Sequence, residues 1–168
     1  RVIESADGLL GASHIILPGV GHFAQICSAF DRLLIRESIV EAISSGTPYL
    51  GICLGMQVLF EKSDEAPGQK GLGILAGSVN KLDTTARIPH MGWNTVTRTA
   101  ADALLDRLEG RHFYFVHGYG LRPVPCTTSI CEYGGPWSAS VARGRVHGVQ
   151  FHPERSGAAG ALLLANFL

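Results

Sequence analysis

Two short apolar runs, each stopped by glycine and followed by a helical pattern, constrain the fold more than any other feature of the chain. Residues 14–17 are β-rich and end in a Pro-Gly-Val-Gly turn, and residues 48–53 form a second such run. Between them, apolar residues recur at helical spacing from 22 to 45, which predicts helix. This strand–helix–strand–helix order favours a parallel sheet with helices on its faces.

The rest of the chain predicts a different arrangement. A helix is expected after the second run, through Met56, Leu59 and Phe60, and a last helix, capped by Ser156, is expected over 158–167. Turn residues separate short predicted strands around 73–75, 92–96, 112–116, 128–132, 138–142 and 146–151. We therefore expect residues 1–168 to form a single α/β domain with an antiparallel extension of the sheet.

Composition excludes several classes of partner. The 168 residues hold 14 Lys+Arg and 14 Asp+Glu, so no excess of positive charge favours nucleic acid or an anionic membrane. No apolar run reaches the roughly 18 residues that span a bilayer, and no charged-then-apolar leader is present, so we expect a cytoplasmic protein. The four cysteines lack zinc spacing. We expect reduced thiols, no metal and no cofactor.

The second apolar run ends in Gly51-Ile52-Cys53-Leu54-Gly55, which fits a nucleophile elbow with cysteine in the place of serine. A nucleophile on so sharp a turn has strained backbone angles, and flanking side chains would clash with neighbouring backbone. The following helix is expected to lower the pKa of the Cys53 thiol, and the Leu54 N–H is placed to donate to an oxyanion. The alternative is a core cysteine that ends a buried strand.

A second motif, Gln150-Phe151-His152-Pro153-Glu154, ends another predicted strand. Pro153 biases His152 toward extended geometry, so the side chains of His152 and Glu154 should project to the same side. Glu154 would then orient the imidazole of His152 toward the thiol of Cys53 as a Cys–His–Glu relay. Alone, such a turn would be structural or metal-related, but the pair of motifs at strand ends is more specific.

The loop Leu17-Pro18-Gly19-Val20-Gly21 follows the first predicted strand and can expose main-chain N–H groups. Phosphate binding is the competing interpretation, but the loop lacks the lysine of a P-loop and the spacing of a dinucleotide fingerprint. We favour a second oxyanion donor in the Gly19–Val20 peptide.

The elbow GICLGMQ (residues 51–57) together with His152-Pro153-Glu154 resembles the signature of class I (triad) glutamine amidotransferases. The segments LPGVG (17–21), PHMGWN (89–94) and YFVHGY (114–119) narrow the resemblance to the glutaminase subunits of imidazole glycerol phosphate synthase. The resemblance covers essentially the whole chain. It implies a three-layer sandwich with a largely parallel central sheet and an antiparallel extension.

The resemblance implies a role for each matching residue. Cys53 would attack the side-chain amide of glutamine, with His152 as base and then acid and Glu154 as its orienting group. Gln57 and Glu65 match positions that hold the amino-acid end of glutamine. Ammonia would pass to a (β/α)8-barrel cyclase subunit, which makes imidazole glycerol phosphate in histidine biosynthesis.

The segment Met91-Gly92-Trp93-Asn94 is interpreted as partner surface, because tryptophan is a frequent interface anchor, although a buried core tryptophan is an equal alternative. Tyr119 lies in a segment that the resemblance places near the subunit junction. Arg155 stands where the family commonly has lysine, so an interface ion pair would keep its charge with altered geometry.

Two further departures bear on this interpretation. The chain has Val116-His117-Gly118-Tyr119 where the family reads VHSY, so any contact of that serine is absent. Family members also open with a strand and helix that are missing before Arg1, which predicts an unpaired sheet edge. Three alternatives to a glutaminase stay open: a non-catalytic docking subunit, an amidotransferase domain for another acceptor, and a different cysteine hydrolase on a related sheet.

Overall fold

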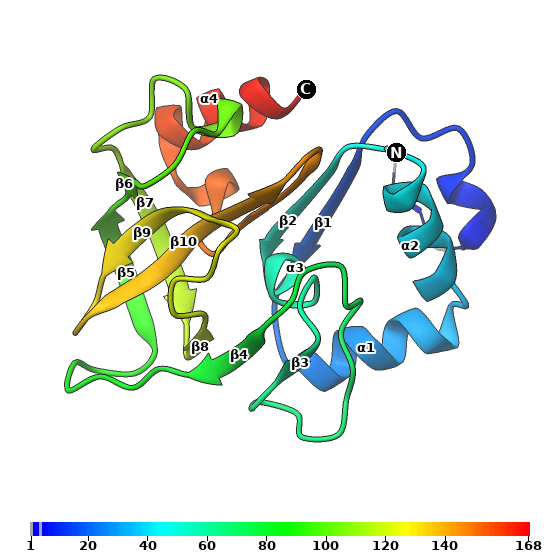
Figure 1. Ribbon diagram of the computed structural model, residues 1–168, viewed down its shortest axis with the longest axis horizontal. Helices are drawn as coiled ribbons and strands as arrows, with labels where there is room; N and C mark the ends of the chain where they lie inside the picture. The colour runs from blue at the N-terminus through cyan, green and yellow to red at the C-terminus, as the bar shows by residue number, and fades with distance from the viewer. Residues whose placement is uncertain (1, 4) are drawn as a thin grey trace.

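The computed structural model describes residues 2–3 and 5–168 and contains a six-stranded sheet that carries both motifs (Figure 1). Its strand order is β1-β2-β11-β10-β9-β6. Strands β1, β2 and β11 are parallel to one another, and the pairs β11–β10, β10–β9 and β9–β6 are antiparallel. The bounds are β1 Ile15–Gly19, β2 Tyr49–Cys53, β11 Val146–Val149, β10 Pro136–Arg143, β9 Thr127–Glu132 and β6 Thr97–Arg98. The parallel strands and their antiparallel extension confirm the expected fold class.

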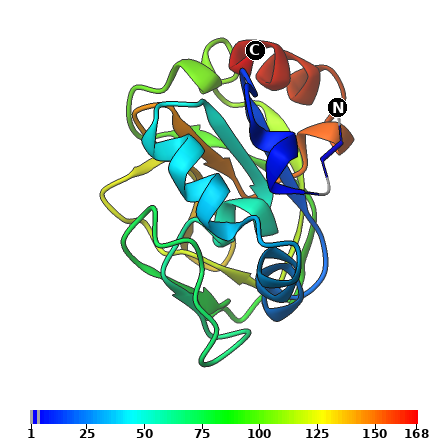
Figure 2. The same cartoon turned by 90° about the vertical axis from the view of Figure 1, so that its right-hand side faces the viewer.

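Helices cover both faces of the parallel strands. Helices α1 (Phe23–Arg32) and α2 (Arg36–Ser44) lie on one side, and α4 (Gly157–Phe167) lies on the other (Figures 1 and 2). Successive side chains of β2 point to opposite faces of the sheet and so belong to different cores. Tyr49 packs with the α1 and α2 side chains, whereas Leu50 and Ile52 pack with α4. Two separate apolar cores therefore hold the sheet between its helices, as in a three-layer sandwich.

Two smaller groups of strands lie beside the main sheet. Strands β5 (His90–Thr95) and β7 (His112–His117) pair antiparallel. Strand β4 (Ser78–Lys81) pairs with β3 (Lys62–Ser63) and β8 (Tyr119–Gly120). The remaining elements are short: η1 Ala6–Leu9, α3 Leu54–Gln57, η2 Ala103–Leu105 and η3 Pro153–Arg155. The end of β7 lies next to the end of β2, where the Val116 carbonyl is 4.0 Å from the sulfur of Cys53.

Two local predictions are wrong. Residues 73–75 form no strand, and the helix after the elbow ends at Gln57 instead of continuing to Phe60. After Gln57 the N–H groups bond three residues back instead of four: Leu59 N–H donates to the Met56 carbonyl at 3.1 Å, and Phe60 N–H donates to the Gln57 carbonyl at 3.2 Å. Residues 72–75 bond to this turn, since Leu72 N–H donates to the Val58 carbonyl at 2.6 Å and Leu75 N–H donates to the Leu59 carbonyl at 2.9 Å.

Ser156 does not cap α4 through its side chain, which corrects a third prediction. Its hydroxyl donates to the His152 carbonyl at 2.6 Å and accepts from the Tyr114 N–H at 3.0 Å. The serine therefore connects β7 to the turn that carries His152, and its side chain makes no capping bond to α4.

Strand β1 lies at the edge of the main sheet, where it pairs with β2 alone among the described strands. A further strand of the kind expected from the resemblance would pair along this edge. The absence of that strand before Arg1 stays a prediction, because Arg1 itself lies outside the described residues. Among residues 2–3 and 5–168, no helix is both long enough and apolar enough to cross a membrane.

Candidate active site

Cys53 occupies a strained turn between β2 and α3. Its backbone has φ 53° and ψ −108°, which is unfavourable for a residue with a side chain. A Cβ at Gly51 would collide with the Gly55 carbonyl, and a Cβ at Gly55 would collide with the Leu17 carbonyl. The two flanking glycines are thus required by close backbone approach, and the strained elbow predicted from the sequence is confirmed.

His152 and Glu154 form the pair expected from their motif. The Nδ1 of His152 lies 2.6 Å from Oε1 of Glu154, so the ring donates to the carboxylate from Nδ1. His152 is extended, as predicted, but Glu154 lies in the turn η3, and this turn, not strand alternation, brings the carboxylate back to the ring. The Nε2 of His152 is buried and has no hydrogen-bond partner among the described residues.

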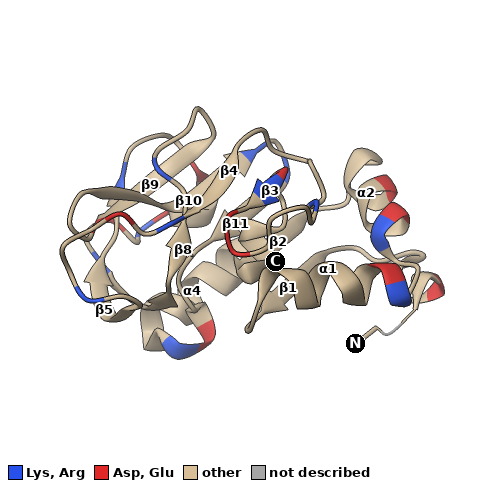
Figure 3. Cartoon of the chain, turned by 90° about the horizontal axis from the view of Figure 1, so that it is seen from below, with Lys and Arg blue, Asp and Glu red and all other residues tan. Residues whose placement is uncertain are grey.

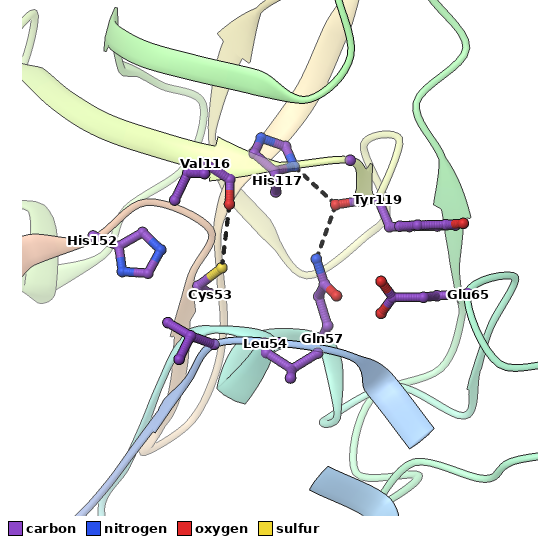
Figure 4. A pocket seen from close by; sticks show the side chains of 11 residues that line it. Cys53, Leu54, Gln57, Glu65, Val116, His117, Tyr119 and His152 are labelled. Atoms are coloured by element: carbon purple, nitrogen blue, oxygen red, sulfur yellow. Dashed lines mark hydrogen bonds between the residues drawn. The ribbon is translucent and has the colours of Figure 1, made fainter. Parts of the chain in front are cut away.

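A cavity of about 180 Å³ joins these residues (Figure 4). It is smaller than the roughly 300–1,000 Å³ of pockets for drug-sized ligands, which suits a ligand of amino-acid size. Its lining comprises Val20, Gly21, Cys53, Leu54, Gln57, Glu65, Val116, His117, Gly118, Tyr119 and His152. Figure 4 places His152 on one side of Cys53 and Gln57 with Glu65 on the other. The cavity therefore has a thiol in its middle and polar groups at one end.

Burial raises the pKa of the Cys53 thiol to about 12, which is the opposite of the predicted direction. The helix α3 has only four residues, and the lowering effects of the Leu54 N–H and the Gln150 side chain are smaller than the loss of hydration. The sulfur accepts from Gln150 Nε2 at 3.6 Å and donates to the Val116 carbonyl at 4.0 Å. The free protein thus holds a neutral thiol that needs a base before it can attack.

Gln57, the last residue of α3, and Glu65 both line the cavity. Gln57 Nε2 donates to the Tyr119 carbonyl at 2.9 Å and to Gln150 Oε1 at 3.0 Å, which fixes the amide. Glu65 Oε2 accepts from the Phe23 N–H at 2.8 Å, at the start of α1. A carboxylate and an amide oxygen at one end of the cavity can bind an ammonium group.

The three residues predicted for the oxyanion hole lie together. A Cβ at Gly19 would lie 2.8 Å from Leu54 Cβ and 2.9 Å from the Gly55 nitrogen, so the end of β1 packs directly on the elbow. Val20 and Leu54 line the cavity, and Val20 is 81% exposed. The peptide groups required for an oxyanion hole are near Cys53, and their role stays a prediction.

The residues predicted as partner surface divide into two groups. Met91 and Trp93 are exposed, and Trp93 is 57% accessible, so a core role for this tryptophan is wrong. Arg155 lies over the Tyr114 ring at 4.7 Å, and Trp93 meets the same ring edge-on at 6.1 Å. These side chains form an exposed aromatic cluster with one cation, Trp93–Tyr114–Arg155.

Asn94 and Tyr119 belong to the interior side of this region. Asn94 Nδ2 donates to the Glu132 carbonyl at 2.9 Å and lies 3.3 Å from His90 Nε2. The Tyr119 carbonyl accepts from Gln57 and from His117 Nδ1, the latter at 2.8 Å. Both residues bond within the chain, and contact with a partner stays a prediction for them.

Sequence reasoning assigned no role to two residues of this site, His90 and Gln150. His90 Nδ1 lies 3.1 Å from His117 Nε2, and Gln150 Nε2 lies 3.6 Å from the sulfur of Cys53. The only signal for Gln150 was its place two residues before His152 in one motif. No group of three or more His, Cys, Asp or Glu that could hold a metal ion occurs among the described residues.

The family model for glutamine amidotransferase class-I matches residues 4–168 of this chain. A solved structure described as a glutamine amidotransferase has a TM-score of 0.75, covering 98% of this chain and 84% of its own at 19% identity, which shows the fold. The chain therefore belongs to the class-I glutamine amidotransferase family.

Sequence relatives narrow the family. The HisH subunit of imidazole glycerol phosphate synthase from Escherichia coli K12 is 47% identical over 171 residues, which cover all of this chain and 85% of that protein. The chloroplastic imidazole glycerol phosphate synthase hisHF of Arabidopsis thaliana is 40% identical over 174 residues, and this chain spans 29% of its length. Within the family, the chain groups with the HisH glutaminase subunits.

Proposed function

We propose that Cys53, His152 and Glu154 are the catalytic triad of this glutaminase. His152 takes the thiol proton at Nε2, and the sulfur attacks the side-chain carbonyl carbon of glutamine. The C–N bond then breaks, ammonia leaves with the proton returned by His152, and water hydrolyses the γ-glutamyl thioester to glutamate. The observation that carries this assignment is the buried, unpartnered Nε2 of His152, held by Glu154 beside the cavity that contains Cys53.

The residues around the triad receive matching roles. The Leu54 N–H and the Gly19–Val20 peptide bind the oxyanion, which is supported by the packing of Gly19 on the elbow. Gln57 and Glu65 bind the amino-acid end of glutamine, which is supported by their place in the lining of the cavity.

We further propose that residues 1–168 act as a single domain and form a heterodimer with a (β/α)8-barrel cyclase subunit, to which they deliver ammonia. The Arabidopsis relative, an imidazole glycerol phosphate synthase hisHF of which this chain spans 29%, supports this partner. The exposed cluster Trp93–Tyr114–Arg155, with the nearby Met91, is the docking surface, and aromatic and arginine side chains are typical interface anchors.

A cytoplasmic location is proposed on the four free cysteines, which suit a reducing compartment. No nucleic-acid partner is proposed, because positive and negative side chains are interspersed instead of segregated, as at the facing ends of α1 and α2 (Figure 3).

The test replaces Cys53 by alanine in the complex with the barrel subunit. Cys53→Ala should abolish glutamine-dependent synthesis of imidazole glycerol phosphate and leave synthesis from added ammonium salt unchanged. Cys126→Ala is the matched control, because this thiol is free but lies outside the cavity. Glutamine-driven turnover by Cys53→Ala would refute the triad, and loss of both activities would show that the partner contact had been damaged instead.

A further inference from the structure

Gln150 contacts the nucleophile but has no role in the triad, the oxyanion hole or the binding of glutamine. The residue follows β11 and is fully buried, and its main-chain N–H donates to the Ala139 carbonyl at 2.8 Å. Its side-chain amide bridges two parts of the site, since Oε1 accepts from Gln57 and Nε2 donates to the sulfur of Cys53. A buried amide with both ends bonded in this way is rigidly placed.

The orientation of this amide is set from the Tyr119 carbonyl, which also fixes the protons of two histidines that lead to β5. The Tyr119 carbonyl can only accept, so His117 must carry its proton on Nδ1. Burial lowers the pKa of His117 to about 3 and that of His90 to about 4, so both rings are neutral near pH 7. His117 Nε2 is then an acceptor, His90 Nδ1 is its donor, and His90 Nε2 accepts from the Asn94 amide.

The same carbonyl fixes the amide of Gln57 (Figure 4), which in turn fixes that of Gln150. Tyr119 O faces the side-chain amide of Gln57, and an oxygen there would leave two acceptors in contact, so the nitrogen must face it. The second hydrogen of Gln57 Nε2 points at Gln150, which must present Oε1. Gln150 Nε2 is therefore the atom that faces the sulfur of Cys53, and it can only donate.

We propose that Gln150 is a positioning residue that holds the Cys53 sulfur at the elbow and favours its thiolate form through the Nε2 hydrogen bond. The thiol of the free protein accepts from Gln150 and donates to the Val116 carbonyl. When His152 removes the proton, the bond to Val116 is lost and the bond from Gln150 becomes charge-assisted. Gln150 thus offsets part of the loss of hydration that burial imposes on the thiolate. The inference rests on the proposed function, in which Cys53 is the nucleophile.

The experiment measures the rate at which iodoacetamide alkylates Cys53 at pH 8 to 9, with peptides resolved by mass spectrometry. Gln150→Met removes both ends of the amide, whereas Gln150→Glu keeps an acceptor for Gln57 and replaces the amide donor by a carboxyl oxygen. Both variants should alkylate Cys53 about tenfold more slowly, as expected for loss of a hydrogen bond to a charged group. Cys126 in the same sample serves as the internal reference.

A matched control is Ser129→Ala, because Ser129 is equally buried in the main sheet and hydrogen-bonded to Ser140. It should leave alkylation of Cys53 unchanged even if it lowers the melting temperature. In turnover assays of the complex, Gln150→Glu should lower kcat with little change of KM for glutamine, since Gln57 keeps its acceptor.

Three outcomes would overturn the proposal. The first is an unchanged rate of Cys53 alkylation in both Gln150 variants. The second is slower alkylation in Gln150→Glu alone, which would indicate an effect of the added charge. The third is an equal slowing of alkylation in Ser129→Ala. Alkylation needs neither glutamine nor partner, so each of these outcomes leaves the proposed function standing. Glutamine-driven turnover by Cys53→Ala would instead remove the function without changing the alkylation result.

Discussion

Replacing Glu154 by glutamine tests how much the orientation of His152 contributes to turnover. Glutamine has nearly the same shape as glutamate, so the turn η3 should be preserved. The change removes a negative charge that lies 2.6 Å from Nδ1 of His152. It also allows the new amide nitrogen to donate to Nδ1, which would move the ring proton to Nε2, where the thiol proton has to be accepted.

The magnitude follows from the exposure of the pair. A hydrogen bond to a charged group contributes about 1.5–3 kcal/mol, which corresponds to a factor of about 10 to 150 in rate. Because the Glu154 side chain is 52% exposed, water screens part of this interaction, and we expect the lower part of that range, about 10- to 30-fold in kcat. For comparison, replacing the buried orienting aspartate of a serine protease by asparagine lowers kcat by about 10⁴-fold.

The assay is glutamate production by the complex with its barrel subunit, followed over a range of glutamine concentrations. The KM for glutamine should stay close to that of the parent, because Glu154 does not line the cavity. Synthesis from added ammonium salt is the control for an intact partner site. A kcat within about twofold of the parent would refute the orienting role, and a loss as complete as that of Cys53→Ala would show that the screening argument is wrong.

Three further predictions concern the elbow, the two buried histidines and the exposed tryptophan. Gly55→Ala should lower the free energy of unfolding by about 1–3 kcal/mol in urea denaturation, because its Cβ would meet the Leu17 carbonyl; unchanged stability would contradict the clash. His90 and His117 have folded pKa values of about 4 and about 3, below the unfolded value near 6.5, so stability should be complete above pH 6.5 and fall as pH drops toward 3. His90→Gln should reduce that slope between pH 7 and 4, and an unchanged slope would show that His90 does not titrate on unfolding. Trp93→Ala should weaken binding to the barrel subunit by about 2 kcal/mol in calorimetry while stability changes by less than about 0.5 kcal/mol, and unchanged affinity would remove Trp93 from the interface.

The elbow could be predicted because its determinants are local. Gly51 and Gly55 are required by backbone contacts within a few residues of Cys53 and with one neighbouring strand. The position of His152 at a strand end could also be predicted, because turn residues follow both motifs. The structure places these strands side by side: β2 and β11 are parallel neighbours with Ile52 opposite Val149. Their adjacency itself was not readable, because nearly a hundred residues separate them.

The pKa of Cys53 could not be predicted from local structure. The sequence showed a helix after the cysteine but not the length of that helix, nor how completely the elbow would be covered. Burial, which depends on contacts from Val116 and Gln150, decides the direction of the shift. The contacts of Gln150 join segments that are 93 and 97 residues apart, so no periodicity could reveal them.

Strand β5 explains why one motif carries two functions. The sequence interpretation treats residues 91–94 as a single partner surface, but side chains of a strand alternate between its faces. Met91 and Trp93 point outward and are exposed, whereas His90 is buried and Asn94 bonds to it across the inner face. Substitutions at Met91 or Trp93 therefore test docking alone. Substitutions at His90 or Asn94 instead change the hydrogen bonds that lead to His117, which lines the cavity.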